Sequence, residues 1–561
     1  MKKTRKLLAL LLVMCIIVIT VSACNKDNGS APSDSSQAPN AGTNPSDSPN
    51  QSSSSSSNSN SNSNSNSSQS PAPGDNTEAN TPVVSDRPLN IAVGQDNGSL
   101  HPFGVSGTGG FASVLGSCYE GLFFFNDAGE KEWLLATGID VISDLQSTIH
   151  IRQGVTFSNG NPLTAEDVMF SIEENAKDAR SFLNVKGIDV EKTSVTDDYT
   201  IDLWFTEFNA AQEPGFASMS IMDKESYDEV ALVTHPIGTG PYVITEYVVG
   251  SHVTAVARDD YWGDPPLIRT LNYKIINEPS QIVNALETGA VDTAAIPLKD
   301  AAYIESLGYR IDTIFGNSVD VPYFNMTEGS LLGTKEARWA VCHAIDRQTI
   351  ADLVYDGKSS PPRWPLSEFL LDFEPRFANR HEVYSIGYDL DRARELAEQA
   401  GLIGQTLRVI TNGTTDGILI AEIIQSDLMK IGVNSEIINY DMATYFSVVM
   451  DESNYDFAIY YVAAPSMMAV DMFAMYLTFV PLGWHGPDRD LWGELTMKAL
   501  TTPDEAARSE MLNDYLDMFL DYTPWFAISE QVSMRACSKD VEGMQYTLSG
   551  GFRLKGLHFV N

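Results

Sequence analysis

Three short stretches of the chain carry apolar residues in the pattern of strands. Residues 88–94 form an apolar run that leads into the polar loop 95–99, and residues 148–152 and 199–204 alternate apolar with polar side chains. A period of two places one row of side chains on each face of a sheet. The sequence therefore predicts strands at these three places.

Apolar residues with helical spacing lie between and after these strands. Thr164 opens one predicted helix, with Asp167 at the spacing of a capping box, and Thr334 caps another. Further helices are predicted over 346–357 and over 421–432, the latter leading into a strand over 433–438. Because helices and strands alternate without a short internal repeat, we expect an α/β fold with more than one lobe.

The amino terminus has the features of an export signal. Basic residues within positions 2–6 precede an apolar run over 7–21, which is shorter than the roughly 20 residues that span a bilayer. The run ends in Val-Ser-Ala-Cys at 21–24, which resembles the lipobox of bacterial lipoproteins. The resemblance implies removal of the signal peptide 1–23 and a lipid on Cys24. An ordinary signal peptide with an incidental cysteine is the alternative.

A low-complexity segment follows the predicted lipid site. Residues 25–86 contain almost no aliphatic or aromatic side chains, with a serine run at 52–57 and alternating Asn and Ser up to 68. Such a segment cannot bury enough apolar surface to offset its ordering entropy. We therefore interpret 24–87 as a lipidated cysteine followed by a disordered tether.

The excess of acidic residues argues against a nucleic-acid-binding protein. The chain of 561 residues has 36 Lys and Arg against 74 Asp and Glu, a formal net charge of −38, and the whole excess lies in 88–561. Neutralising phosphates needs a basic face, so a nucleic-acid partner is excluded. The acidic balance mildly favours cationic ligands.

Cysteine and histidine give no sign of a metal centre. Beyond the leader and Cys24, the residues Cys118, Cys342 and Cys537 allow at most one disulfide, and whether Cys118 pairs with Cys537 stays open. No CxxC and no Cys/His spacing suggests a metal site. His343 lies inside a helical pattern, which indicates a packed core residue.

Enzyme motifs are incomplete or missing. Residues 107–112 formally fit GxGxxG/A but lack a dinucleotide-binding context, and 104–108 fall short of a nucleophile elbow because the fifth residue is Thr108. HExxH and the P-loop do not occur. We therefore predict no catalytic residue, no metal and no cofactor, and a binding protein rather than an enzyme.

A series of motifs across 88–561 follows the order of a known family. The most diagnostic is Arg-Gln-Gly-Val-Thr-Phe-Ser-Asn-Gly at 152–160, followed by Pro-Leu-Thr-Ala-Glu-Asp-Val at 162–168. With these motifs the chain resembles the bacterial extracellular solute-binding proteins of family 5, the peptide- and nickel-binding class that serves ABC importers. The other matching motifs are 119–122, 126–130, 238–242, 261–263, 285–292, 344–347, 388–389, 393–401 and 421–425.

The resemblance implies an α/β, two-lobed, type II periplasmic-binding-protein-like fold with an extra subdomain inserted in lobe I. Lobe I is expected at 88–118, 235–315 and 535–561. Its subdomain is expected at 119–234, and lobe II at 316–534. The two lobes are expected to close over a ligand.

A glycine-rich stretch after the first strand is the first candidate binding element. In the family a similar loop presents main-chain groups to the ligand, which implies a binding role for Ser106, Gly107 and Thr108. The alternative is a plain flexible turn.

Charged clamps that dipeptide-binding members use are missing at the matching positions. Those members hold the ligand's ammonium with an Asp and its carboxylate with an Arg. Here the matching places fall near Ala463 and Thr411, and no acid follows until Asp471, which could itself align with a family acid. A buried unpaired charge costs several kcal/mol, so a free dipeptide is predicted to be a poor ligand.

Four aromatic residues near this region are candidate platforms for a neutral peptide or a sugar chain. Each could instead be a core residue. They are Tyr460, Tyr461, Phe473 and Trp484.

Together these observations predict a monomeric, lipid-anchored receptor outside the cytoplasm. It would capture a peptide or another oligomeric small solute, such as an oligosaccharide, and deliver it to the permease and ATPase subunits of an ABC importer. The closed form is what the permease would recognise. The alternative is a surface sensor or adhesion lipoprotein that keeps the fold without transport.

Overall fold

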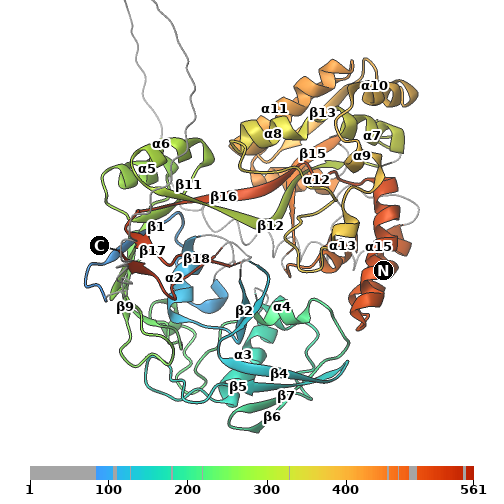
Figure 1. Ribbon diagram of the computed structural model, residues 1–561. Helices are drawn as coiled ribbons and strands as arrows, with labels where there is room; N and C mark the ends of the chain where they lie inside the picture. Colours follow the sequence, from blue (N-terminus) through green and yellow to red (C-terminus); the bar gives the residue numbers. More distant parts are fainter. Residues whose placement is uncertain are drawn as a thin grey trace, which may run out of the picture. The chain divides into compact units, whose positions relative to one another are not determined.

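The computed structural model describes residues 84–104, 110–126, 128–178, 181–217, 219–327, 329–451, 454–464, 466–478, 489–547 and 551–560. These residues build a mixed sheet of ten strands (Figure 1). In spatial order the strands are β14 (Asn434–Asn439), β13 (Thr406–Thr411), β15 (Phe457–Ala463), β12 (Arg310–Phe324), β16 (Ser529–Cys537), β11 (Thr293–Ile296), β1 (Leu89–Val93), β10 (Thr270–Ile275), β9 (His252–Ala257) and β8 (Tyr242–Val248).

Strands β12 and β16 lie in the middle of this sheet and pair antiparallel. The first part of β12 pairs with β16, from Arg310 opposite Cys537, and from Ser318 onward β12 also pairs with β15. The pairing register shifts between Phe315 and Val319. A bulge of this kind bends a strand and increases its twist. In Figure 1 both strands extend from the side of α5 and α6 towards β13 and β15.

A smaller antiparallel sheet lies outside the main one. Its order is β4 (Ala136–Ser143), β5 (Gln146–Ile151), β7 (Thr200–Trp204) and β6 (Ser194–Asp197). Helix α3 (Ala165–Lys177) packs on this sheet through Val168 and Ile172, which share a buried cluster with Ile149 and Ile201. All of these elements fall inside the predicted subdomain range 119–234, whose boundaries stay a prediction.

The remaining helices fall into two groups along the chain, before and after β12. Those before β12 are α2 (Gly110–Cys118), α4 (Gln212–Ala217), α5 (Pro279–Glu287) and α6 (Ala301–Ser306). Those after it are α7 (Lys335–Ala344), α8 (Arg347–Val354), α9 (His381–Ser385), α10 (Leu390–Gln399), α11 (Thr415–Lys430), α12 (Met442–Asp451), α13 (Ala469–Thr478), α14 (Arg489–Leu500) and α15 (Glu505–Tyr522). The largest cluster of buried apolar residues joins β12, β13 and β15 to the second group.

The three predicted strands and the two predicted helix caps agree with the structure, whereas one helix begins earlier than predicted. The stretches 88–94, 148–152 and 199–204 form β1, β5 and β7. At the start of α3 the Thr164 N–H donates to Asp167 Oδ2 at 2.8 Å, and Thr334 Oγ1 accepts the Ala337 N–H at 3.2 Å at the start of α7. Helix α11 begins at Thr415 rather than at 421, because the Thr414 hydroxyl accepts the N–H of Gly417 and caps an additional turn.

Three cysteines and one histidine of the described residues lie in the core. Cys118, Cys342 and Cys537 are buried and free, so no disulfide forms between them. His343 is fully buried, with Nδ1 2.6 Å from the Gly387 carbonyl oxygen, which agrees with the predicted core role.

Candidate functional site

The carboxyl ends of β13 and β15 lie side by side, because the two strands are parallel neighbours with Thr411 opposite Ile459. Thr411 is fully buried, its hydroxyl donates to Asn439 Oδ1 at 2.7 Å, and it accepts the Gly413 N–H at 3.2 Å. The residue at the position of the missing Arg therefore shapes the turn after β13. In this conformation its hydroxyl has no free face for a solute.

An aromatic stack continues from this edge along β15. Tyr460 and Tyr461 stack with ring centroids 4.4 Å apart, and Tyr445 of α12 stacks on Tyr460 at 5.5 Å. The buried Tyr445 hydroxyl donates to the Ile459 carbonyl at 3.1 Å, which anchors the inner end of the stack. Tyr461 is 37% exposed, so it is the ring of this stack that offers a surface to a solute.

Ala463 lies where β15 meets the bulge of β12, opposite Ser318. The Ala464 N–H donates to the Asn317 carbonyl at 3.4 Å, and the Asn317 side-chain amide donates to the Ala464 carbonyl. The end of β15 is therefore fastened to the bulge by its own main chain. No charged side chain takes part in these contacts.

Two other candidates lie on α13. Phe473 is fully buried against Tyr515 and Phe519, with ring centroids 4.9 and 5.2 Å away, so its ring is a core side chain in this conformation. Asp471 lies in the first turn of α13, where burial raises the pKa of its carboxyl.

The remaining candidates lie outside the described residues. Ser106, Gly107 and Thr108 fall in the range 105–109, Trp484 in the range 479–488, and the predicted lipid site Cys24 before residue 84. Their roles stay predictions.

Two buried acids on the long strands were not among the sequence candidates. Asp320 of β12 and Glu530 of β16 lie on adjacent strands, since Asp320 faces Ser529 in the register. Asp320 accepts hydrogen bonds from the Tyr355 hydroxyl and from the Gln531 amide at 2.8 Å, and burial raises its pKa to about 7. The sequence feature that could have indicated Asp320 is an acid between two apolar residues of a strand, Val319-Asp320-Val321.

Glu530 is more isolated than Asp320. Its Oε1 accepts the Glu368 N–H at 2.9 Å, whereas its Oε2 has no hydrogen-bond partner. Burial raises its pKa to about 8. Both acids therefore hold protons in the folded protein at pH values where a free carboxylate is ionised.

A cavity of about 700 Å³ lies between α2, β2 (Phe123–Phe125), β3 (Lys131–Trp133) and β19 (Phe552–Arg553). Its lining includes aromatic rings and charges of both signs. Glu120 at its base accepts hydrogen bonds from the Tyr261 hydroxyl at 2.7 Å, the Trp262 indole N–H at 2.9 Å and the Thr239 hydroxyl at 3.0 Å. Burial raises the pKa of this carboxyl.

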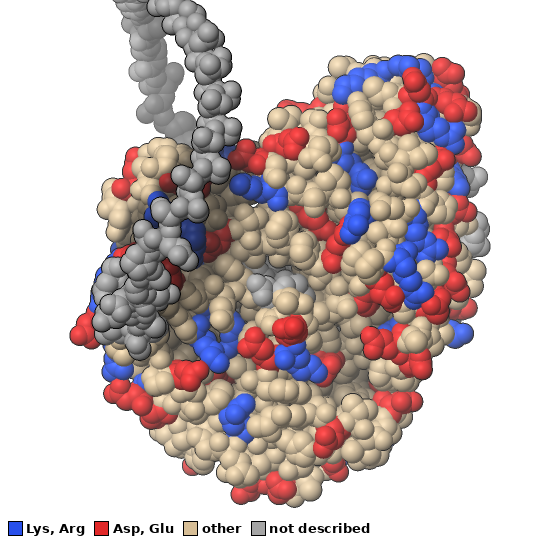
Figure 2. Space-filling model, viewed as in Figure 1, with Lys and Arg blue, Asp and Glu red and all other residues tan. Residues whose placement is uncertain are grey.

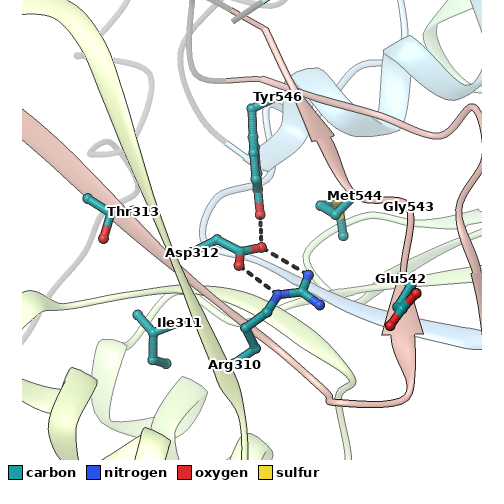
Figure 3. Close-up of a pocket in the computed structure, with 8 residues that line it drawn as sticks. All are labelled: Arg310, Ile311, Asp312, Thr313, Glu542, Gly543, Met544 and Tyr546. Atoms are coloured by element: carbon teal, nitrogen blue, oxygen red, sulfur yellow. Dashed lines mark hydrogen bonds and ion pairs between the residues drawn. The ribbon is translucent and has the colours of Figure 1, made fainter.

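A second, shallower hollow of about 580 Å³ contains a closed polar network (Figure 3). Arg310 Nε donates to Asp312 Oδ1 at 2.7 Å, and the Tyr546 hydroxyl donates to Asp312 Oδ2 at 2.7 Å. These groups satisfy one another, and the pKa of Asp312 is lowered by Arg310 and Tyr546 against the opposing effect of burial. The hollow therefore holds a structural brace between β12 and the chain near β18 (Gln545–Tyr546).

Charged side chains of both signs lie on the surface of the protein. Figure 2 shows Asp and Glu across the face that it draws, with Lys and Arg interspersed, in keeping with the net charge of −38. Within the described ranges no group of three His, Cys, Asp or Glu is placed to hold a metal ion. In the same part of the chain, no helix is long and apolar enough to cross a membrane.

A large mixed α/β sheet with two long central strands is the fold of the type II periplasmic binding proteins, and solved structures of that class match it. The chain belongs to the bacterial extracellular solute-binding proteins of family 5, because the model of that family's middle part matches residues 132–481. This is a transport family whose members bind solutes outside the cytoplasm.

Individual relatives are distant. Protein XP55 of Streptomyces lividans is 27% identical over 56% of this chain, and the match spans 58% of the length of that protein. The glutathione-binding protein GsiB of Salmonella paratyphi A is 23% identical over 84% of this chain and 94% of its own. The structure of the ABC transporter substrate-binding protein CtaP of Listeria monocytogenes covers 85% of this chain and 99% of its own at 22% identity, with a TM-score of 0.75.

Proposed function

We propose that this protein is a lipid-anchored substrate-binding protein of an ABC importer. It captures a peptide-like solute between two closing lobes and delivers the solute to a membrane permease driven by an ATPase subunit. It carries out no reaction of its own and works as a monomer outside the cytoplasm. Membership of the solute-binding family supports the class, and a relative named for binding glutathione, a tripeptide, supports the kind of solute.

The observation that carries the proposal is the pair of long strands. The register shift of β12 between Phe315 and Val319 lies at the predicted boundary between lobe I and lobe II at residue 316. A strand that bends at a bulge while staying paired on both sides can act as a hinge. The exposed Tyr461 and the end of β15 at Ala463 lie beside this bulge. A solute bound there would contact the segment that moves.

A ligand screen tests the proposal. A solute bound between the lobes stabilises the protein by about 2.7 kcal/mol at a hundredfold excess over Kd. We expect a small subset of a thermal-shift library of peptides, oligosaccharides and metal complexes to raise Tm, and small-angle scattering to show compaction with those compounds only. A broad library without any stabilising compound would contradict solute capture and favour the sensor or adhesion alternative.

Lipid anchoring is a separate prediction from the motif at 21–24. Several acyl chains on the mature amino-terminal Cys24 give a stable membrane anchor. Cys24→Ala is therefore expected to release the protein into the medium or to leave the signal peptide uncleaved, as membrane fractionation and mass spectrometry would show. Cys118→Ala is the matched control, because Cys118 is a buried core thiol, and it should leave fractionation unchanged. Unaltered membrane retention of Cys24→Ala would contradict the anchor.

A further inference from the structure

The cavity beside β19 contains a cation that has no hydrogen-bond or ion-pair partner among the described residues. Arg553 lines the cavity and is partly buried, yet its guanidinium makes no hydrogen bond and no ion pair with the described residues. Its guanidinium carbon lies 3.6 Å from the centroid of the Phe124 ring. A guanidinium has five N–H donors in one plane, so stacking on a ring leaves those donors open at its edge.

The acids near Arg553 are already engaged elsewhere. Glu120 accepts three hydrogen bonds from Tyr261, Trp262 and Thr239, and Glu132 accepts one from the Asn126 amide at 3.3 Å. Neither carboxylate lies within ion-pair distance of Arg553. These acids act on Arg553 through charge attraction without contact, so its partly buried guanidinium keeps hydrogen-bond donors for a ligand.

A second cation in the same cavity repeats the arrangement. The Arg152 guanidinium lies 4.9 Å from the centroid of the Trp262 ring, and its Nε donates to the Leu134 carbonyl at 2.6 Å. Its terminal amino groups make no hydrogen bond within the described part of the chain. The cavity therefore combines guanidinium donors with aromatic walls, which suits an anion attached to an apolar group.

We propose that this cavity binds the carboxylate end of the solute, with Arg553 as the residue that accepts the carboxylate and Phe124 and Trp262 as walls for the adjoining apolar group. The site would replace the Arg that is missing near Thr411. Pro102 and Ala112, which line the cavity, precede and follow the predicted binding stretch 105–109 in the sequence. The assignment to the solute rests on the proposed transport function, whereas carboxylate binding itself does not.

Two small probes test the cavity without knowledge of the solute. The first is 3-phenylpropionate, and the second is 3-phenylpropanamide, which has the same shape without the charge. We expect calorimetry or ligand-observed NMR on the full-length mature protein to show at least about tenfold tighter binding of the carboxylate, as expected for a charge-assisted bidentate contact. Equal affinities, or no binding of either probe at millimolar concentration, would overturn the proposal.

Three variants separate the role of Arg553 from a general loss of fold. Arg553→Gln is expected to weaken 3-phenylpropionate about tenfold or more and to leave 3-phenylpropanamide unchanged, whereas Arg553→Lys should keep part of the preference. Arg394→Gln is the matched control, because Arg394 is an exposed arginine of α10 that donates to the Lys430 carbonyl. A loss of carboxylate preference in Arg394→Gln, or its retention in Arg553→Gln, would overturn the assignment. Because the probe comparison on the unaltered protein needs no variant, misfolding cannot hide the answer.

The ligand screen distinguishes failure here from failure of the transport proposal. If library peptides stabilise the protein equally with and without Arg553→Gln, solute capture stands and the carboxylate site is overturned. If 3-phenylpropionate binds at Arg553 but no library compound gives compaction, the carboxylate site stands and the transport proposal fails.

Discussion

The edge at β13 and β15 and the cavity at β19 both contain polar and aromatic groups, yet they differ in how those groups are paired. At the edge, Thr411 is bonded to Asn439, and Phe473 is packed in the core. In the cavity, Arg553 lies on the Phe124 ring and has no hydrogen-bond acceptor in the part of the chain that the structure describes. Polar groups that satisfy one another hold a fold in place, whereas a cation left without an acceptor is available to a ligand. The edge at β13 and β15 therefore holds the shape of the fold, whereas the cavity at β19 offers a charge to a ligand.

The largest expected effect separates a core ring from a cavity ring. Phe473→Ala removes a fully buried ring and is expected to lower the free energy of unfolding by about 3–5 kcal/mol. Phe124→Ala removes a partly exposed ring under Arg553 and is expected to cost less, about 1–2 kcal/mol, mainly from lost packing and the cation–π contact. Urea unfolding of both variants measures the difference. Equal losses would contradict the contrast between the two regions.

The next prediction concerns how stability depends on pH through two buried acids, Asp320 of β12 and Glu530 of β16. The raised pKa values of Asp320, about 7, and Glu530, about 8, mean that the folded protein retains protons that the unfolded chain releases above about pH 4. Their contribution to stability is therefore complete below pH 4 and is lost as pH rises to about 8. Since one pKa unit corresponds to about 1.4 kcal/mol, we expect the free energy of unfolding to fall by a few kcal/mol between pH 5 and pH 8.

A variant sharpens the pH prediction. Asp320→Asn keeps a neutral side chain of the same size, so its unfolding free energy should depend less on pH than that of the unaltered protein. Asp391→Asn serves as the control, because the Asp391 side chain is fully exposed on α10. Parallel pH profiles for Asp320→Asn and the unaltered protein would mean that Asp320 is ionised in the fold.

Features made by residues close together in the chain could be predicted from the sequence, whereas features made by distant residues could not. The Thr164–Asp167 capping box and the strand β7 depend on residues close together in the chain, and both were predicted. Tyr460 and Tyr461 were predicted only as either core residues or platforms, because exposure depends on neighbours from other elements, and the contact of Tyr460 with Tyr445 was not predicted. Arg553 and Phe124 are far apart in the sequence and meet only through folding, so no local pattern could indicate the cavity.

Domain boundaries show the same dependence on long-range pairing. The lobe boundary at 316 is a prediction from family resemblance, whereas the register shift of β12 between Phe315 and Val319 arises from pairing with β16, more than two hundred residues later. The aromatic and acidic residues of the α13 segment could not be sorted by sequence either. Phe473 and Asp471 differ by two positions, and only packing against α15 shows that the Phe473 ring is enclosed.

A third prediction compares peptides of different length. Without an acid at the position of Ala463, the ammonium of a free dipeptide loses a charge-assisted contact of about 1.5–3 kcal/mol, which corresponds to about ten- to hundredfold weaker binding, while Arg553 holds its carboxylate. Longer peptides held by main-chain contacts, or neutral oligomers stacked on Tyr461, are expected to outcompete it in calorimetry. Micromolar or tighter dipeptide binding would show that another acid, with Asp471 the first candidate, supplies the clamp.

Blocking one end of the dipeptide tests the two regions separately. An N-acetylated dipeptide has no ammonium to leave unpaired and keeps its carboxylate for Arg553, so it is expected to bind more tightly than the free dipeptide. A C-terminal amide of the same dipeptide should gain nothing. The opposite order would place an acid, rather than Arg553, in contact with the solute.

The smallest expected effect is on the exposed ring of the β15 stack. Tyr461→Ala removes a platform worth about 0.5–1.5 kcal/mol, so peptide or sugar hits from the ligand screen should bind about two- to tenfold more weakly. Tyr461→Phe keeps the ring and should bind nearly as well as the unaltered protein, which isolates stacking from any contact of the hydroxyl. Because Tyr461 is over one third exposed, neither variant should lower Tm as much as Phe473→Ala. An equal loss of affinity in Tyr461→Phe would show that the hydroxyl, and not the ring face, meets the solute, and the edge at β15 would then resemble the polar cavity rather than contrast with it.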